Sequence, residues 1–189
     1  MLFESTTKAA TQDVPSGCDP RSLDALLHRF ARNGIWLDPT IQSFRYFAPT
    51  QWDAIFAEFR TLVQSIRKNH VSILAGTDSS DFLEDRGDPP GISLHDESAL
   101  LVDSGFTPVE ALRAATLNPA LFLGFSDSLG TIEAGKTANL VLLEANPLQE
   151  IRNTRRIAAV ISEGHYLDRQ MLDRLVHENC RKCTEDSAN

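Results

Sequence analysis

Cysteine is scarce in this chain of 189 residues, which contains only three. A small, odd number of cysteines argues against a disulfide framework and fits a reducing compartment. The first eight residues also lack the basic stretch and apolar core of a signal peptide. We therefore expect a cytoplasmic protein.

Basic residues are too few and too scattered for a nucleic-acid-binding protein. The 18 Lys and Arg residues are outnumbered by 26 Asp and Glu residues, and the net charge is −8. The densest basic stretches, at 152–156 and 181–182, are short and flanked by acidic residues. No apolar run reaches the roughly 18–20 residues of a membrane span. We therefore expect neither nucleic acid nor a membrane as a partner.

The composition is that of a globular protein, with 42% hydrophobic residues. The length suits one domain, or one domain with a small appendage. It is too short for a complete eight-stranded α/β barrel with anything else attached, since such a barrel needs about 250 residues.

Two helix–strand units open the chain. Asp19-Pro20 is a typical helix start, Asn33-Gly34 a typical helix end, and residues 35–37 form a short apolar strand. The second helix is expected to begin at Thr50, with Asp53 completing a capping box, and to end before a strand at 71–75. Two such units predict parallel strands covered by helices.

The second helix carries the clearest apolar stripe in the chain, which we interpret as a packing face rather than a cofactor site. The stripe consists of Trp52, Ile55, Phe56, Phe59, Leu62, Val63 and Ile66.

The second half begins with helices and continues with strands. Three helices are expected here. The first spans 94–102, the second begins at a capping box of Thr107 and Glu110, and the third spans 118–124. Strands are expected at 130–132, 135–136 and 140–143, followed by a hairpin of 157–161 with 165–167. The chain then ends in a helix and a polar tail, frayed from Glu178 onward.

Asp78 is the most informative polar residue, because it follows the apolar strand 71–75 through Gly76 and Thr77. Functional groups gather at the carboxyl ends of parallel strands, and a carboxylate there can bind a metal or accept a proton from water. The alternative is that Asp78 only caps a turn through its own backbone.

Several motifs together resemble the C-terminal part of the amidohydrolase superfamily, in its imidazolonepropionase-related and prolidase-like branch. They extend over residues 71–168, and residues 35–40 also resemble the penultimate barrel strand of that branch, which ends in Pro-Thr. The motifs are Ile73–Asp78, Gly91–Glu97, Gly105–Ala120, Gly130–Leu143 and Asn146–Leu148.

The resemblance implies part of a (β/α)8 metal-dependent hydrolase barrel followed by strands of a small β-sandwich. The barrel segment would span 1–128, the sandwich strands 129–169, and the C-terminal helix and tail 170–189. By the same resemblance, Asp78 would contact a divalent metal, zinc or similar, and relay a proton. The substrate would be a small-molecule amide cleaved at a C–N bond.

The chain departs from this family pattern in its metal ligands. The family takes its other ligands from earlier barrel strands, beginning with a His-x-His pair, and this sequence contains no such pair. Only Asp78 can be assigned, whereas a catalytic metal needs about three protein ligands. We therefore expect the isolated chain to be metal-free and inactive. Asn139 stands where the family usually has Asp, at a structural turn.

Other candidate ligands are weaker. His95 could line a pocket mouth, but a locally bonded histidine at a helix start is the more common situation. His177, Cys180 and Cys183 have a spacing that suggests zinc, without an evident fourth ligand. His28 lies within a helix, and His70 precedes the strand at the end opposite to Asp78.

A non-enzymatic role is the competing hypothesis. A partial barrel leaves strand edges and apolar faces uncovered, which favours self-association or pairing with a chain that supplies the missing strands. No feature of the sequence speaks for a third possibility, a small-ligand-binding module.

Overall fold

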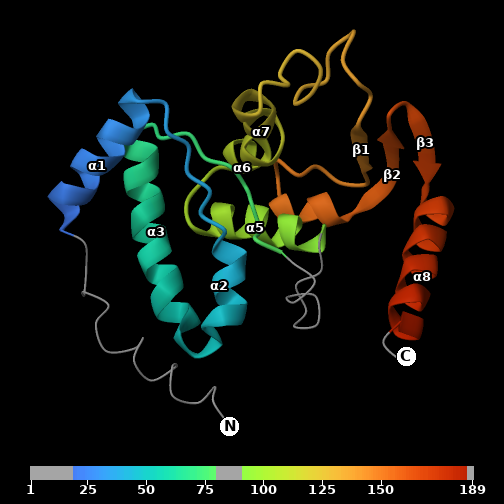
Figure 1. The fold of residues 1–189 in the computed structure, drawn as a ribbon, viewed down its shortest axis with the longest axis horizontal. Coiled ribbons are helices and arrows are strands. Elements are labelled where there is room, and N and C mark those ends of the chain that lie inside the picture. Colours follow the sequence, from blue (N-terminus) through green and yellow to red (C-terminus); the bar gives the residue numbers. More distant parts are fainter. Residues whose placement is uncertain (1–18, 80–90, 187–189) are drawn as a thin grey trace.

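The computed structural model describes residues 19–79 and 91–186, with side chains up to residue 177 (Figure 1). It is an α/β structure with a small sheet, as the sequence predicts. The helical elements are α1 (Pro20–Arg32), α2 (Ile41–Phe47), η1 (Pro49–Gln51), α3 (Trp52–Lys68), α5 (Ile92–Asp103), α6 (Pro108–Ala115), α7 (Leu117–Phe122), η2 (Ile151–Arg155) and α8 (Arg169–Asp186). The strands are β1 (Leu140–Leu143), β2 (Ile157–Ser162) and β3 (His165–Asp168).

Helices α1 and α6 begin at the residues that the sequence indicates. The Asp19 side chain caps α1 by accepting a hydrogen bond from the backbone N–H of Ser22, at 3.1 Å. At α6, Thr107 and Glu110 form a complete capping box. In both helices Pro occupies the first turn, where its missing N–H costs nothing.

The expected parallel neighbours at 35–37 and 71–75 do lie side by side, but their pairing is reduced to one parallel bridge between Leu37 and Ile73. Leu37 donates its N–H to Ser72 O at 3.0 Å, and its carbonyl accepts from Leu74 N at 2.8 Å. Figure 1 shows the two segments, blue after α1 and green after α3, on the α5 side of α3.

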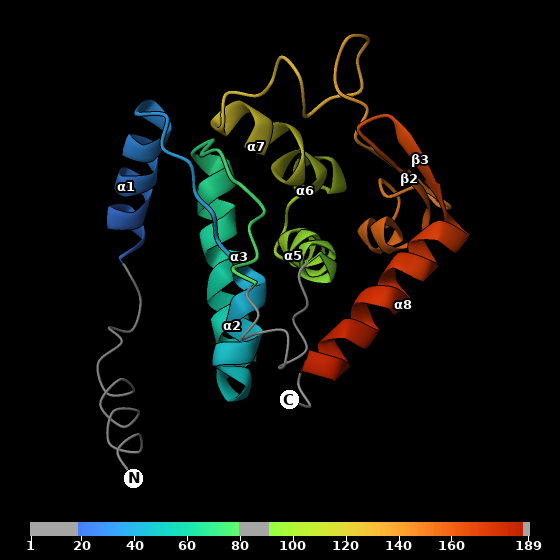
Figure 2. The ribbon, with the colours of Figure 1, turned by 45° about the vertical axis from the view of Figure 1, so that its right-hand side comes forward.

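A single apolar core joins these segments to the helices. The packing face predicted on α3 is confirmed, since Val63 and Ile66 are buried and the aromatic residues of the stripe pack against the core. Figure 2 shows α3 beside α2 and α1, with the sheet and α8 on the opposite side of the molecule. The buried members of the core are Leu27, Ile41, Val63, Ile66, Val71, Ile73, Ala75, Ala99, Leu100, Leu101, Phe106, Ala111, Ala114 and Ile151.

The region between the two extended segments differs from the expectation in two ways. Helix α3 does not begin at a Thr50 cap, because residues 49–51 form the 3-10 turn η1 and Gln51 precedes the helix without a side-chain cap. Helix α2 is an element that the sequence did not indicate. Its N-cap residue Thr40 is left-handed, with φ 43°, and makes no side-chain capping bond.

A buried carboxylate from another helix caps α2 instead. Glu97 of α5 is fully buried, and its two oxygens accept hydrogen bonds from Ile41 N at 3.1 Å and Gln42 N at 2.7 Å. These amides belong to the first turn of α2, where backbone N–H groups have no partner within the helix. The contact fixes α2 against α5.

The small sheet has the order β1-β2-β3 and is antiparallel throughout. The predicted hairpin is confirmed as β2 and β3, and 140–143 as β1. The strands expected at 130–132 and 135–136 are wrong. Gly130 and Gly135 have φ values of 92° and 90°, and Ile132 is 86% exposed, so this stretch is a series of turns, and no strand within residues 19–79 and 91–186 pairs with it.

Element η2 attaches the sheet to the helical body. Ile151 is buried in the shared core, and two arginines that follow it in η2 form ion pairs with α5. Arg152 contacts Asp103 at 2.7 Å, and Arg155 contacts Asp96 at 2.5 Å. A buried apolar side chain and two ion pairs thus connect the two regions.

The chain ends in helix α8, which follows β3 directly and extends to Asp186. The predicted C-terminal helix is confirmed, but the helix continues past Glu178, where a frayed tail was expected. In the described residues, no helix has the length and apolar character that crossing a membrane requires.

Replacing Glu97 with Ala should lower the free energy of unfolding by about 3 kcal/mol, because two buried amides of α2 lose their hydrogen-bond acceptor. Urea unfolding followed by circular dichroism measures this. The control Glu58→Ala, at an exposed position of α3, should change stability by less than about 0.5 kcal/mol. Equal losses in both variants would show that the cap contributes nothing.

Candidate functional site

Asp78 lies beyond the end of the 71–75 segment and is exposed to solvent. Its backbone is left-handed, with φ 54°, so the chain turns sharply at this residue. The turn is supported by Ser79, whose N–H donates to Thr77 Oγ1 at 3.3 Å and whose hydroxyl lies 2.6 Å from Ser93 Oγ. The carboxylate is therefore presented on a short, hydrogen-bonded turn.

A second carboxylate at the end of the neighbouring segment supports this turn. Asp38 follows Leu37, and its Oδ1 accepts a hydrogen bond from Gly76 N at 2.8 Å. A Cβ on Gly76 would lie under 3.0 Å from three atoms of the Asp38 carboxylate, so any side chain at this position would force that carboxylate to move. The sequence analysis missed Asp38, and the only signal was its position at the end of a predicted strand.

Helix α5 holds the loops that follow both segments. Ser93, in its first turn, meets Ser79 beside Asp78, and Glu97, one turn later, binds the start of α2 after Asp38. Together with the Asp38–Gly76 bond, these contacts fix the two loops relative to each other.

A catalytic metal does not fit the described residues on their own. Among residues 19–79 and 91–177, no three His, Cys, Asp or Glu side chains come together in a way that could hold a metal ion. A lone carboxylate falls short of the roughly three protein ligands that such a metal requires.

His95 lies in the first turn of α5 and is half-buried. Burial and the positive charge of Arg155 lower the pKa of His95 below its ordinary value of 6.5, and the Asp96 carboxylate partly opposes this shift. Folding therefore favours the neutral imidazole.

The other candidate ligands have structural surroundings or lie outside the described side chains. A ring nitrogen of His177 lies 2.8 Å from the Asp173 carbonyl oxygen on α8, while the side chains of Cys180 and Cys183 lie outside the described part. Asn139 accepts a hydrogen bond from Glu163 N at 2.7 Å and so supports the β2–β3 turn.

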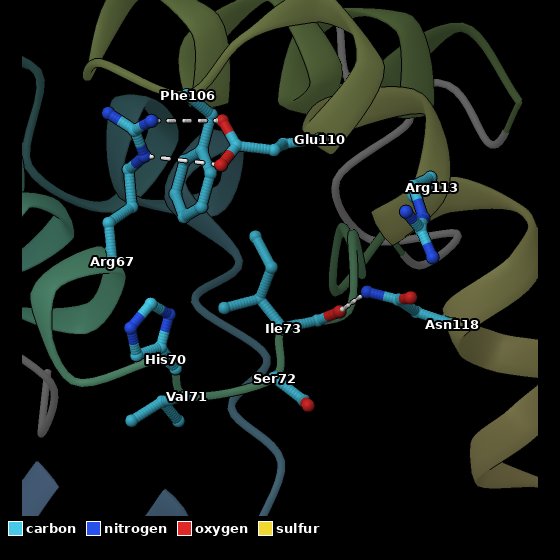
Figure 3. Close-up of a pocket in the computed structure, with 9 residues that line it drawn as sticks. All are labelled: Arg67, His70, Val71, Ser72, Ile73, Phe106, Glu110, Arg113 and Asn118. Atoms are coloured by element: carbon cyan, nitrogen blue, oxygen red, sulfur yellow. Dashed lines mark hydrogen bonds and ion pairs between the residues drawn. The ribbon is translucent and has the colours of Figure 1, made fainter. Parts of the chain in front are cut away.

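A shallow cleft of about 440 Å³ lies at the beginning of the 71–75 segment, at the end opposite to Asp78 (Figure 3). Figure 3 shows Arg67 and Glu110 paired beside the Phe106 ring. The ion pair joins Arg67 Nη2 and Glu110 Oε2 at 3.4 Å. Asn118 donates to Ile73 O at 2.8 Å on the other wall. The cleft and the carboxylate turn are therefore separate features.

With this geometry in place, comparison with known proteins identifies the family. Residues 32–167 match the model of the amidohydrolase family, so the chain belongs to that family. The matched range contains Asp38, Asp78 and Glu97.

Individual relatives are longer than this chain. An imidazolonepropionase from Geobacillus thermodenitrificans is 31% identical over 132 residues, which is 69% of this chain and 28% of the relative. A putative prolidase from Bifidobacterium longum superposes with a TM-score of 0.59 and 28% identity, covering 82% of this chain and 43% of that protein. Phenylurea hydrolase B superposes with a TM-score of 0.61 and 28% identity, covering 77% of this chain and 36% of that protein. The chain thus spans less than half of each.

The contact between Asp38 and Gly76 can be tested by a double-mutant cycle. Gly76→Ala should destabilise the protein by about 1–3 kcal/mol, because the new methyl group collides with the Asp38 carboxylate. In an Asp38→Ala background the same change should cost much less. Equal costs in both backgrounds, measured by urea unfolding, would contradict the close approach.

The lowered pKa of His95 predicts a loss of stability in acid. As pH falls through 6.5, the unfolded chain takes up a proton that the folded His95 resists, so the free energy of unfolding decreases until the folded pKa is passed. His95→Gln should flatten this part of the pH profile. His28→Gln, at an exposed position of α1, is the matched control and should retain the slope.

Proposed function

We propose that this chain contributes the Asp78 carboxylate to a hydrolase that cleaves C–N bonds of small-molecule amides. The observation that carries the proposal is the position of Asp78. It lies on a turn held by hydrogen bonds, after a buried segment with a parallel neighbour, in a chain of the amidohydrolase family. Relatives described as an imidazolonepropionase, a putative prolidase and a phenylurea hydrolase agree with this reaction class.

Asp78 would take a proton from the attacking water and return it to the leaving nitrogen. Its exposed carboxylate can accept that proton, and the bonds from Asp38 and Ser93 to the turn would hold it in position. The complete fold would also use a divalent metal, zinc or similar. Since the described residues do not fit a metal by themselves, we propose that the chain alone is metal-free and inactive.

A second candidate function is that of a non-catalytic interaction module. It is favoured by the uncovered apolar surface around α7, where Leu121, Phe122, Leu123 and Phe125 are between 47% and 61% exposed. Contiguous apolar surface of this kind marks a region that another polypeptide covers. Self-association of this chain, or pairing with a chain that supplies missing strands, would bury it.

A hybrid protein tests the catalytic proposal. Residues 32–167 would replace the superposed region of the Bifidobacterium longum prolidase, and hydrolysis of an Xaa-Pro dipeptide would be measured. The hybrid should be active, and Asp78→Asn should reduce its kcat by at least about 100-fold, whereas the exposed Asp127→Asn should not. A folded hybrid that is indifferent to Asp78→Asn would refute the assignment.

Elemental analysis of the isolated chain provides an independent measurement. The purified protein should contain no stoichiometric metal and should not hydrolyse the dipeptide. A stoichiometric metal that disappears on Asp78→Ala would contradict the proposal that this chain alone is metal-free.

A further inference from the structure

The cleft at the beginning of the 71–75 segment carries a positive charge that its own lining does not balance (Figure 3). The charged residues that line it are Arg67, Glu110 and Arg113, so two guanidinium groups face one carboxylate. With His70 counted as neutral, the lining has a net charge of +1.

Arg67 and Glu110 are already engaged with each other and with the protein. Arg67 donates through Nε to Glu110 Oε1 at 3.4 Å, and through Nη1 to the Gly105 carbonyl at 2.8 Å. Its guanidinium carbon also lies 5.9 Å from the centre of the Phe106 ring. These contacts form a fixed wall without net charge, so the excess charge of the cleft comes from the other wall.

Arg113, on that other wall, has a fixed backbone and a free side chain. It lies in the last turn of α6, next to Ala114, which is fully buried and whose carbonyl accepts a hydrogen bond from Ala75 N at 3.0 Å. Within residues 19–79 and 91–177, the exposed Arg113 guanidinium makes no ion pair, hydrogen bond or ring contact. Its planar set of N–H donors is therefore available to a ligand.

The floor between the two walls is apolar. Val71 and Ile73 contribute buried side chains to it, and Figure 3 shows Ile73 between the paired wall and Arg113. The side chain of Asn118 donates to Ile73 O at 2.8 Å and so holds α7 against the segment. An apolar floor beside an unpaired guanidinium suits a ligand that has an apolar body and one anionic end.

We propose that this cleft binds a small organic monocarboxylate. The guanidinium of Arg113 would hold the carboxylate through two parallel hydrogen bonds, and the apolar body would lie over Ile73. One unbalanced positive charge suits a monoanion, whereas Glu110 would repel the second charge of a phosphate ester. The volume of about 440 Å³ accommodates such a ligand. Because the cleft lies at the end of the segment opposite to Asp78, the inference does not rest on the proposed function.

The test is a titration of the isotope-labelled full chain with benzoate at constant ionic strength, followed by NMR. We expect saturable shifts of the backbone amide signals of Ile73 and Arg113 and of the side-chain amide signals of Asn118. Benzyl alcohol has the same ring without the charge, and inorganic phosphate has charge without the ring. Each should bind at least about tenfold more weakly than benzoate.

Substitutions of two exposed arginines separate the site from the overall charge of the protein. Arg113→Gln should weaken benzoate binding by at least about tenfold, and Arg113→Lys, which keeps the charge without the planar fork, should retain part of the affinity. The control Arg60→Gln, at an exposed position of α3 outside the cleft, changes the net charge equally and should bind benzoate like the unsubstituted chain. The NMR spectra of the free variants show directly that each remains folded.

Several outcomes would overturn the proposal. Benzoate that causes no saturable shift, or that binds Arg113→Gln as tightly as the unsubstituted chain, would remove the site. Equal binding of benzyl alcohol would show an apolar cleft without a role for charge, and tighter binding of phosphate would replace the carboxylate by an inorganic anion. Shifts centred on Asp78 instead of Ile73 would place the ligand elsewhere. Since no turnover is measured, none of these results depends on whether the chain takes part in catalysis.

Discussion

The carboxylate of Glu97 is the interaction on which the arrangement of the candidate site depends. A fully buried carboxyl group must find hydrogen-bond partners, and two of its partners are the first amides of α2. Only Pro39 and Thr40 separate Asp38 from helix α2, so the same contact helps to set where the 35–38 segment ends. One turn earlier on α5, Ser93 holds the turn that carries Asp78. A single helix therefore positions both loops.

Features of the fold that depend on neighbouring residues were predictable from the sequence. The caps of α1 and α6, the apolar face of α3 and the β2–β3 hairpin all follow from local spacing. Helix α2 was not predictable from the sequence, because its cap, Glu97, lies 55 positions further along the chain than Gln42. The strand expected at 130–132 failed for a related reason, since a strand needs a partner and none lies beside that stretch in the described residues.

The candidate site was predictable in part. The motif around Asp78 indicated the amidohydrolase family, and the match over residues 32–167 confirms the membership. The role of Asp38 was not predictable, because an aspartate after a short strand is common and its partner, the amide of Gly76, lies 38 residues away. The closeness of that carboxylate disfavours a side chain at position 76, and neither residue reveals this closeness alone.

The attachment of the small sheet through η2 has a mechanical consequence. Ile151 and Thr154 are the buried residues of η2, while Arg152 and Arg155 form ion pairs that are partly exposed to solvent. Dissolved salt weakens partly exposed ion pairs but leaves apolar burial in place. Rising ionic strength therefore weakens only the charged part of the contact between η2 and α5, and the buried part keeps the small sheet attached.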